Sequence, residues 1–98
     1  MDGLFLYLVQ LYPDRNGDLL KVGISGDPDI RAGGFKTLAP HLKLVGVWRI
    51  LSKRFEKKAL KELVNYGARP YGGEVVELHP QMAKKVIDRM VKRLPLTS

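Results

Sequence analysis

The sequence contains no cysteine and no long hydrophobic run. Without cysteine, disulfide bonds and Cys-ligated zinc or iron–sulfur sites are excluded. The apolar run over residues 4–9 has only six residues, too few for a membrane span or for the core of a signal peptide. The first residues are acidic rather than basic. These absences predict a soluble, cytoplasmic protein that has no membrane partner.

The chain of 98 residues has room for one domain. Its content of 45% hydrophobic and 28% charged residues is that of a folded domain, because disordered chains are less hydrophobic. We expect residues 1–94 to form this domain and residues 95–98 to form a loose tail. One small site or one face of a single domain must then carry the function.

The net charge of +7 is unevenly distributed along the chain. Residues 1–48 hold five basic and five acidic groups, whereas residues 49–93 hold twelve basic and five acidic groups. An excess confined to one half indicates either a surface that faces a polyanion, most often nucleic acid, or simple solubility. Composition leaves both explanations open.

Hydrophobic patterning and turn residues predict seven elements. Strands are expected over residues 4–11, 19–24, 42–50 and 74–78, with a loop over 68–73. Helices are expected over 27–38, from a Ser52 cap to Tyr66, and over 80–94. The first strand is apolar at nearly every position, which is typical of a central strand covered on both faces. The order β-β-α-β-α-β-α predicts an α+β domain with a small, mostly antiparallel sheet flanked by helices.

Two charged residues, Glu56 and Arg31, fall on the apolar sides of predicted helices. At about 100° per residue, Glu56 projects near the middle of a side made of Phe55, Ala59, Leu60, Leu63, Val64 and Tyr66. An uncompensated buried carboxylate is costly, so it needs a cation, a metal or a raised pKa. Either Glu56 and Arg31 form a buried salt bridge, or they line a cleft that holds a divalent cation and a phosphate.

The predicted hairpin of the first two strands carries Tyr7 and Lys21. Their spacing about the turn at residues 14–15 allows the two side chains to lie side by side on one face of the sheet. Lys21 interrupts an otherwise apolar run just before Gly23.

Leu6-Tyr7-Leu8 is followed by Lys21-Val22-Gly23-Ile24-Ser25, then by Arg31 eight positions after Gly23, and then by a helix that carries Glu56. Over residues 4–78, this series resembles the GIY-YIG nuclease superfamily. It is most similar to the phage-associated branch, whose second motif reads Lys-hydrophobic-Gly followed by Asp-Pro and an arginine. Each motif is short, but their order, the spacing and the β-β-α-β-α frame agree with the family.

The resemblance implies a divalent-metal-dependent endonuclease that hydrolyses phosphodiester bonds of duplex DNA, with Mg²⁺ or Mn²⁺ as cofactor. Tyr7 matches the tyrosine that orients or deprotonates the attacking water, and Gly23 is the glycine of the second motif. Arg31 matches the arginine that contacts the scissile phosphate, and Glu56 matches the carboxylate that binds the metal. Lys21 replaces a second tyrosine; its ammonium beside Tyr7 is expected to favour the phenolate or to hold phosphate.

Six basic residues are candidates for contact with DNA phosphates: Arg49, Lys53, Arg54, Lys57, Lys58 and Lys61. A solvated helix face explains the same residues equally well. The chain has no room for a separate recognition domain, so sequence specificity should be low, or supplied by a partner protein or by a second copy in a homodimer.

Two other functions remain open. The first is a catalytically inactive GIY-YIG-like module that binds nucleic acid, which would bind DNA with a steep salt dependence and never cleave it. The second is a phage-type interaction factor, which would bind a protein and not DNA.

Overall fold

The computed structural model describes residues 4–26 and 42–93. Their elements follow in the order β1 (Leu4–Tyr12), β2 (Asn16–Ser25), β3 (Lys43–Ile50), α2 (Arg54–Asn65), β4 (Arg69–Gly72), β5 (Val75–Glu77) and α3 (Pro80–Arg93). The predicted α+β class is confirmed. The helix expected over 27–38, with Arg31, and the tail expected over 95–98 lie outside the described residues.

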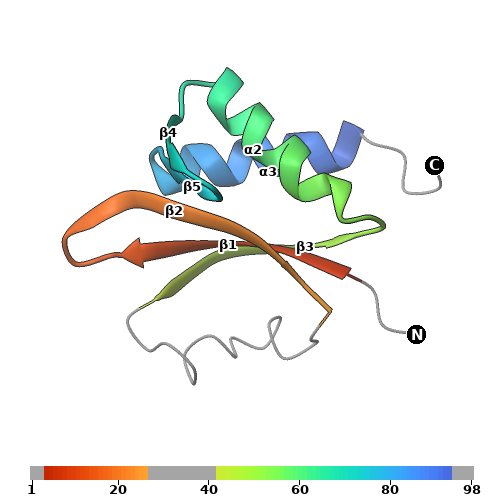
Figure 1. Ribbon diagram of the computed structural model, residues 1–98, viewed down its shortest axis with the longest axis horizontal. Helices are drawn as coiled ribbons and strands as arrows, with labels where there is room; N and C mark the ends of the chain where they lie inside the picture. The colour runs from red at the N-terminus through yellow and green to blue at the C-terminus, as the bar shows by residue number, and fades with distance from the viewer. Residues whose placement is uncertain (1–3, 27–41, 94–98) are drawn as a thin grey trace.

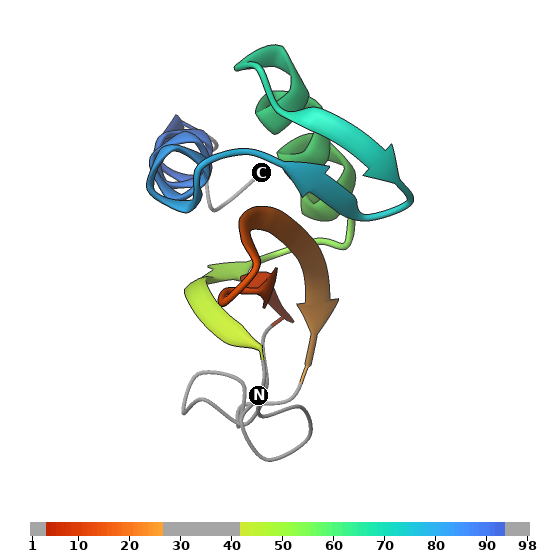
Figure 2. The ribbon, with the colours of Figure 1, turned by 90° about the vertical axis from the view of Figure 1, so that its left-hand side faces the viewer.

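The five strands form one sheet in the order β3-β1-β2-β5-β4, with every neighbouring pair antiparallel. The strands β1 and β2 form the predicted hairpin, closed by a turn in which the Arg15 N–H donates to the Tyr12 carbonyl oxygen at 3.1 Å. Figure 1 shows α2 and α3 above β1, β2 and β3, with β4 and β5 at the level of the helices, and Figure 2 shows the two helices beside each other. No helix of the described part is both long and apolar enough to cross a membrane.

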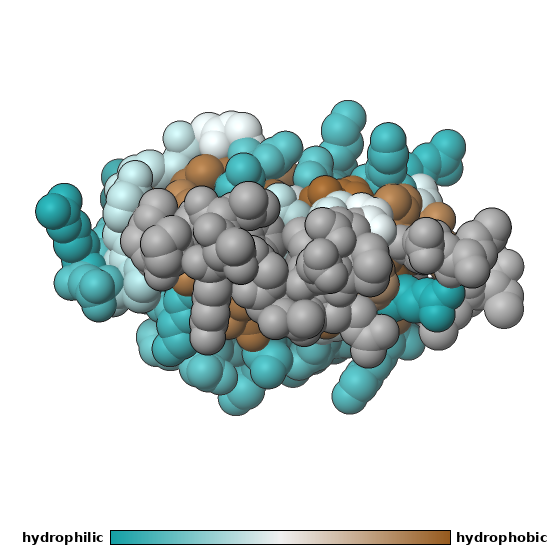
Figure 3. All heavy atoms as spheres, turned by 90° about the horizontal axis from the view of Figure 1, so that it is seen from below, coloured by the Kyte–Doolittle hydropathy of each residue, from teal (hydrophilic) through white to brown (hydrophobic). Residues whose placement is uncertain are grey.

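The strand β1 is buried on both faces of the sheet. Leu6 and Leu8 belong to the core cluster that α2 and α3 cover, whereas Phe5 and Val9 are buried outside that cluster. Because alternate residues of a strand point to opposite faces, the near-continuous apolar run of β1 follows from its central position. In the view of Figure 3, hydrophilic side chains project along both long sides of the molecule, with apolar atoms visible between them.

Two predictions about local structure are wrong. Residues 69–72 form the strand β4 rather than a loop. All four residues of β4 are exposed, and the segment has no hydrophobic pattern that would predict a strand. Its pairing with β5 holds it at the edge of the sheet. Proline is tolerated in an edge strand, which explains Pro70. Val64 and Tyr66 are 42% and 46% exposed, although the helical projection places them on the apolar side. Tyr66 lies beyond the last helical residue, and the buried stripe of α2 is confined to Phe55, Ala59 and Leu63.

Candidate functional site

Tyr7 lies across the neighbouring strand because residue 23 has no side chain. Tyr7 pairs with Gly23 in the β1–β2 register. A Cβ atom at residue 23 would overlap Cζ and Oη of Tyr7 and would lie 2.6 Å from its Cε1. The phenol ring therefore fills the space above Gly23 and extends from β1 over β2. This explains the requirement for glycine at residue 23.

Lys21 lies on the same face of the sheet as Tyr7, one diagonal step away. Lys21 pairs with Val9 and Tyr7 pairs with Gly23, so the two residues occupy alternate positions of one face rather than directly opposed positions. Lys21 is partly buried. Its positive charge therefore lies close to the part of β2 that the Tyr7 ring covers.

Glu56 is placed by the sharp start of α2 directly after β3. The Ser52 hydroxyl oxygen accepts a hydrogen bond from the Arg54 N–H at 3.2 Å, although the helix cap itself is at Lys53. The adjacent Phe55 is buried in the core. This fixes Glu56 in the first turn of α2, where it is partly buried at the edge of the buried stripe rather than near its middle.

Glu74 was not identified as a site residue from the sequence. Together with Tyr7, Lys21 and Glu56 it forms a group of residues that we call the corner. Gly72 and Gly73 have φ values of +110° and +57°, a conformation that favours glycine, and they reverse the chain between β4 and β5. The Val22 N–H then donates to the Glu74 carbonyl oxygen at 3.1 Å. Glu74 thus stands beside β2, next to Gly23. Only the pairing of β2 with β5 reveals this, and the sequence carries no local signal for it.

The charges of this corner act on each other. Burial raises the pKa of Tyr7, and the carboxylates of Glu74 and Glu56 raise it further. Burial also raises the pKa of Glu56, as does Glu74, while Lys21 and Lys57 partly oppose the rise. Four side chains from separate elements are therefore electrostatically coupled: Tyr7, Lys21, Glu56 and Glu74.

The expectation that Lys21 favours the Tyr7 phenolate is wrong. The pKa of Tyr7 is raised rather than lowered. The carboxylates of Glu74 and Glu56 act on the phenol, whereas the charge of Lys21 acts on Glu56. Tyr7 is consequently a neutral phenol near neutral pH, able to donate and accept hydrogen bonds.

The structure leaves the predicted partnership of Glu56 with Arg31 open, since Arg31 lies outside the described residues. Within residues 4–26 and 42–93, the carboxylates of Glu56 and Glu74 have no hydrogen bond or ion pair. In the same part of the chain, no three His, Cys, Asp or Glu side chains lie together as a metal-binding group. Among the described residues, Glu56 and Glu74 are thus the carboxylates that could hold a cation here.

The six basic residues singled out from the sequence are not on one surface. Arg54, Lys57, Lys58 and Lys61 are exposed on α2, and Lys53 is exposed just before it. Arg49 pairs with Phe5, so it points to the face of the sheet away from the helices. Further exposed basic residues lie on α3, the last helix: Lys84, Lys85, Arg89, Lys92 and Arg93.

No protein-family model matches the chain, and no curated protein or solved structure is detectably similar to it. The resemblance to GIY-YIG nucleases therefore depends on the motifs in the sequence.

Proposed function

We propose that the protein is a divalent-metal-dependent endonuclease that hydrolyses phosphodiester bonds of duplex DNA with low intrinsic sequence specificity. One observation carries the proposal: Tyr7 of β1 and Lys21 of β2 lie on one face of their hairpin, and Glu56 of α2 is near enough for its charge to act on Tyr7 and for the charge of Lys21 to act on it. These are three of the four residues to which the family resemblance assigns catalysis. The fourth, Arg31, is proposed to contact the scissile phosphate.

The donor set of the corner suits a hard divalent cation. Mg²⁺ takes oxygen ligands and is usually held by one or two carboxylates, with phosphate oxygens and waters completing its shell. Glu56 and Glu74 would meet that requirement, and burial and the charge of Glu74 raise the pKa of Glu56. Glu56, assisted by Glu74, would hold the Mg²⁺ or Mn²⁺ ion, which supplies Lewis-acid polarisation of the phosphate when bound.

The remaining side chains supply positioning and charge. The neutral Tyr7 hydroxyl accepts a hydrogen bond from the attacking water and orients it towards phosphorus. The Lys21 ammonium offsets negative charge that develops on the phosphate oxygens in the transition state. Gly23 keeps the Tyr7 ring over β2, so the phenol is held in place before the substrate arrives.

A plasmid nicking assay tests this function. Wild-type protein should nick supercoiled DNA with Mg²⁺ or Mn²⁺ and should not do so with a chelator. Glu56→Gln should lower the rate by more than about 100-fold, since loss of outer-shell partners of a metal alone costs roughly 10–100-fold. Asp14→Asn is the matched control, because Asp14 is an exposed carboxylate in the β1–β2 turn. If Glu56→Gln nicks as fast as Asp14→Asn, the metal role of Glu56 is wrong.

A nucleic-acid-binding module without turnover is the second candidate. Its supporting observation is that α2 and α3 together carry nine basic and three acidic residues. Tight, salt-dependent DNA binding with no nicking in any divalent metal would favour this function over the nuclease.

A further inference from the structure

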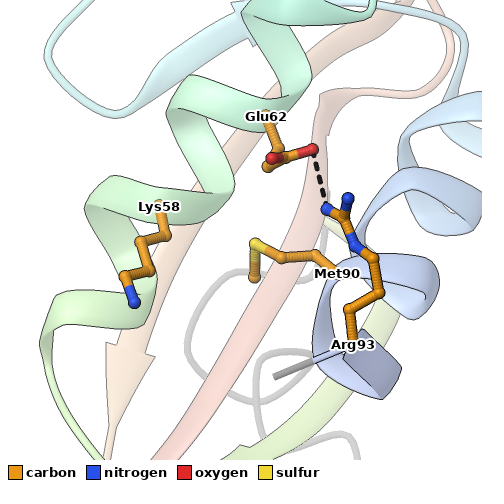
Figure 4. A pocket seen from close by; sticks show the side chains of 4 residues that line it. All are labelled: Lys58, Glu62, Met90 and Arg93. Atoms are coloured by element: carbon orange, nitrogen blue, oxygen red, sulfur yellow. Dashed lines mark ion pairs between the residues drawn. The ribbon is translucent and has the colours of Figure 1, made fainter. Parts of the chain in front are cut away.

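A groove separates α2 from α3 on the side of the molecule away from the sheet. It encloses about 330 Å³ and is lined by Lys58 and Glu62 of α2 and by Met90 and Arg93 of α3. Figure 4 shows Met90 reaching between the helices and the Arg93 guanidinium pointing at the Glu62 carboxylate, with Lys58 about one turn away from Glu62 on α2. The groove thus combines an apolar floor with two cations at its rim.

The ion pair across this groove is partly exposed to solvent, so another anion can reach Arg93. Arg93 Nη2 lies 3.2 Å from Glu62 Oε2, and the two side chains are 56% and 27% exposed. Exposed ion pairs contribute little to stability and are weakened by salt. Arginine also binds phosphate through two parallel hydrogen bonds. A phosphate can therefore compete with the Glu62 carboxylate for Arg93.

A row of cations connects the groove to the catalytic corner. At about 100° per residue, the order around α2 runs from Glu56 through Lys57 and Lys61 to Lys58, and then to Glu62 at the groove. The three lysines are exposed, and the charge of Lys57 already acts on Glu56. A polyanion lying across the exposed side of α2 would meet positive charge over the stretch from Lys57 through Lys61 to Lys58.

We propose that the groove of Lys58, Glu62, Met90 and Arg93 binds the phosphate backbone of duplex DNA, which continues over the α2 lysines to the Glu56 corner. The occupant is a polyanion because the two helices that form the groove carry most of the net positive charge of the chain. Glu62 then acts against binding, since it competes with phosphate for Arg93. The inference rests on the proposed DNA substrate and does not require cleavage.

The test measures binding of a short fluorescein-labelled DNA duplex by fluorescence anisotropy, with a chelator and at several NaCl concentrations. Arg93→Gln should weaken binding and reduce the slope of log affinity against log salt by about 0.9, the value for one lost phosphate contact. Glu62→Gln should strengthen binding, because Arg93 is released. An increase in affinity cannot come from partial unfolding, so this variant keeps the test valid if Arg93→Gln is unstable.

Two control variants change the net charge equally but lie in the β1–β2 turn. Arg15→Gln is paired with Arg93→Gln, and Asp14→Asn is paired with Glu62→Gln; both turn residues are exposed. Larger effects in the groove than in the turn support the inference. Equal effects in the two places would show that affinity follows net charge alone and would overturn it. Groove-dependent binding without nicking would retain this inference and reject the nuclease, whereas nicking with groove-independent binding would do the reverse.

Discussion

Tyr7 and Trp48 each lie across a glycine, but their polar atoms meet different surroundings. The Tyr7 ring covers Gly23 of β2, and the Trp48 ring covers Gly46 of its own strand, where an added Cβ would lie 2.6 Å from Cη2. Leu6 pairs with Trp48 whereas Tyr7 pairs with Gly23, so alternation puts the two rings on opposite faces of the sheet.

The N–H group of the Trp48 indole has a hydrogen-bond partner on α3. Its Nε1–H donates to Asp88 Oδ1 at 2.6 Å, which ties β3 to α3. The Tyr7 hydroxyl lies in the field of two carboxylates, which together with burial raise its pKa. The same packing arrangement therefore serves as an anchor on one face and holds the proposed catalytic phenol on the other. The difference lies in the charges around the polar atom and not in how the ring packs.

Filling the space above Gly23 should have the largest effect. In Gly23→Ala, the new methyl group displaces the Tyr7 ring, and overpacking of this kind costs about 1–3 kcal/mol. We expect urea unfolding to show that loss and plasmid nicking to be abolished. The double variant Tyr7→Ala/Gly23→Ala should recover the stability, because the ring is gone, but should not recover nicking. If Gly23→Ala alone nicks normally, the position of the phenol is irrelevant to the function.

Removal of the Glu74 carboxylate, which was not identified as a site residue from the sequence, should have the next largest effect. Glu74→Gln keeps the shape of the side chain and removes its charge from Tyr7 and Glu56. We expect a roughly 10–100-fold lower nicking rate at limiting Mg²⁺, partly restored at high Mg²⁺. Glu77→Gln is the matched control three residues further along the chain, since Glu77 lies at the end of β5 and accepts a hydrogen bond from Asn16. Equal rates for the two variants, at every metal concentration, would remove Glu74 from the site.

Loss of the Trp48–Asp88 hydrogen bond should lower the stability of the protein and leave the nicking rate unchanged. Trp48→Phe leaves the partly buried Asp88 carboxylate without its donor, which costs about 1–3 kcal/mol. Urea unfolding measures this cost. Nicking, measured well below the unfolding transition, should equal that of the wild type. A loss of nicking in the folded variant would mean that the two aromatic rings do not differ in role.

Local patterns predicted the parts of the molecule that depend on local residues. The turn residues of the β1–β2 hairpin and the spacing about them placed Tyr7 and Lys21 on one face of the sheet, and helical periodicity placed Glu56 next to the apolar side of α2. The turn, the strand pairing and the helix are all specified within a few residues along the chain.

Contacts between distant segments could not be predicted in this way. Glu74 reaches the corner only because β5 pairs with β2, and no residue near Glu74 specifies that pairing. The same omission led to the wrong direction for the Tyr7 pKa, because Lys21 was considered without the two carboxylates. The groove between α2 and α3 was also missed, since the Glu62–Arg93 pair joins residues far apart in the sequence.

The smallest expected effect is a pH-dependent difference in thermal stability. Burial and the charge of Glu74 raise the pKa of Glu56, so the folded state binds this proton more tightly than the unfolded state does. The associated stability is fully present below the unfolded pKa of about 4.3 and is lost as pH rises through the higher folded pKa. In metal-free buffer at pH 7, Glu56→Gln should therefore raise Tm by a small amount, and the difference should vanish in acid.

Asp88→Asn should lower Tm at pH 7, because it removes the charge from the Trp48 hydrogen bond. If both variants lowered Tm at pH 7, Glu56 would be a stabilising group like Asp88, and the contrast between the reactive face and the anchored face would fail.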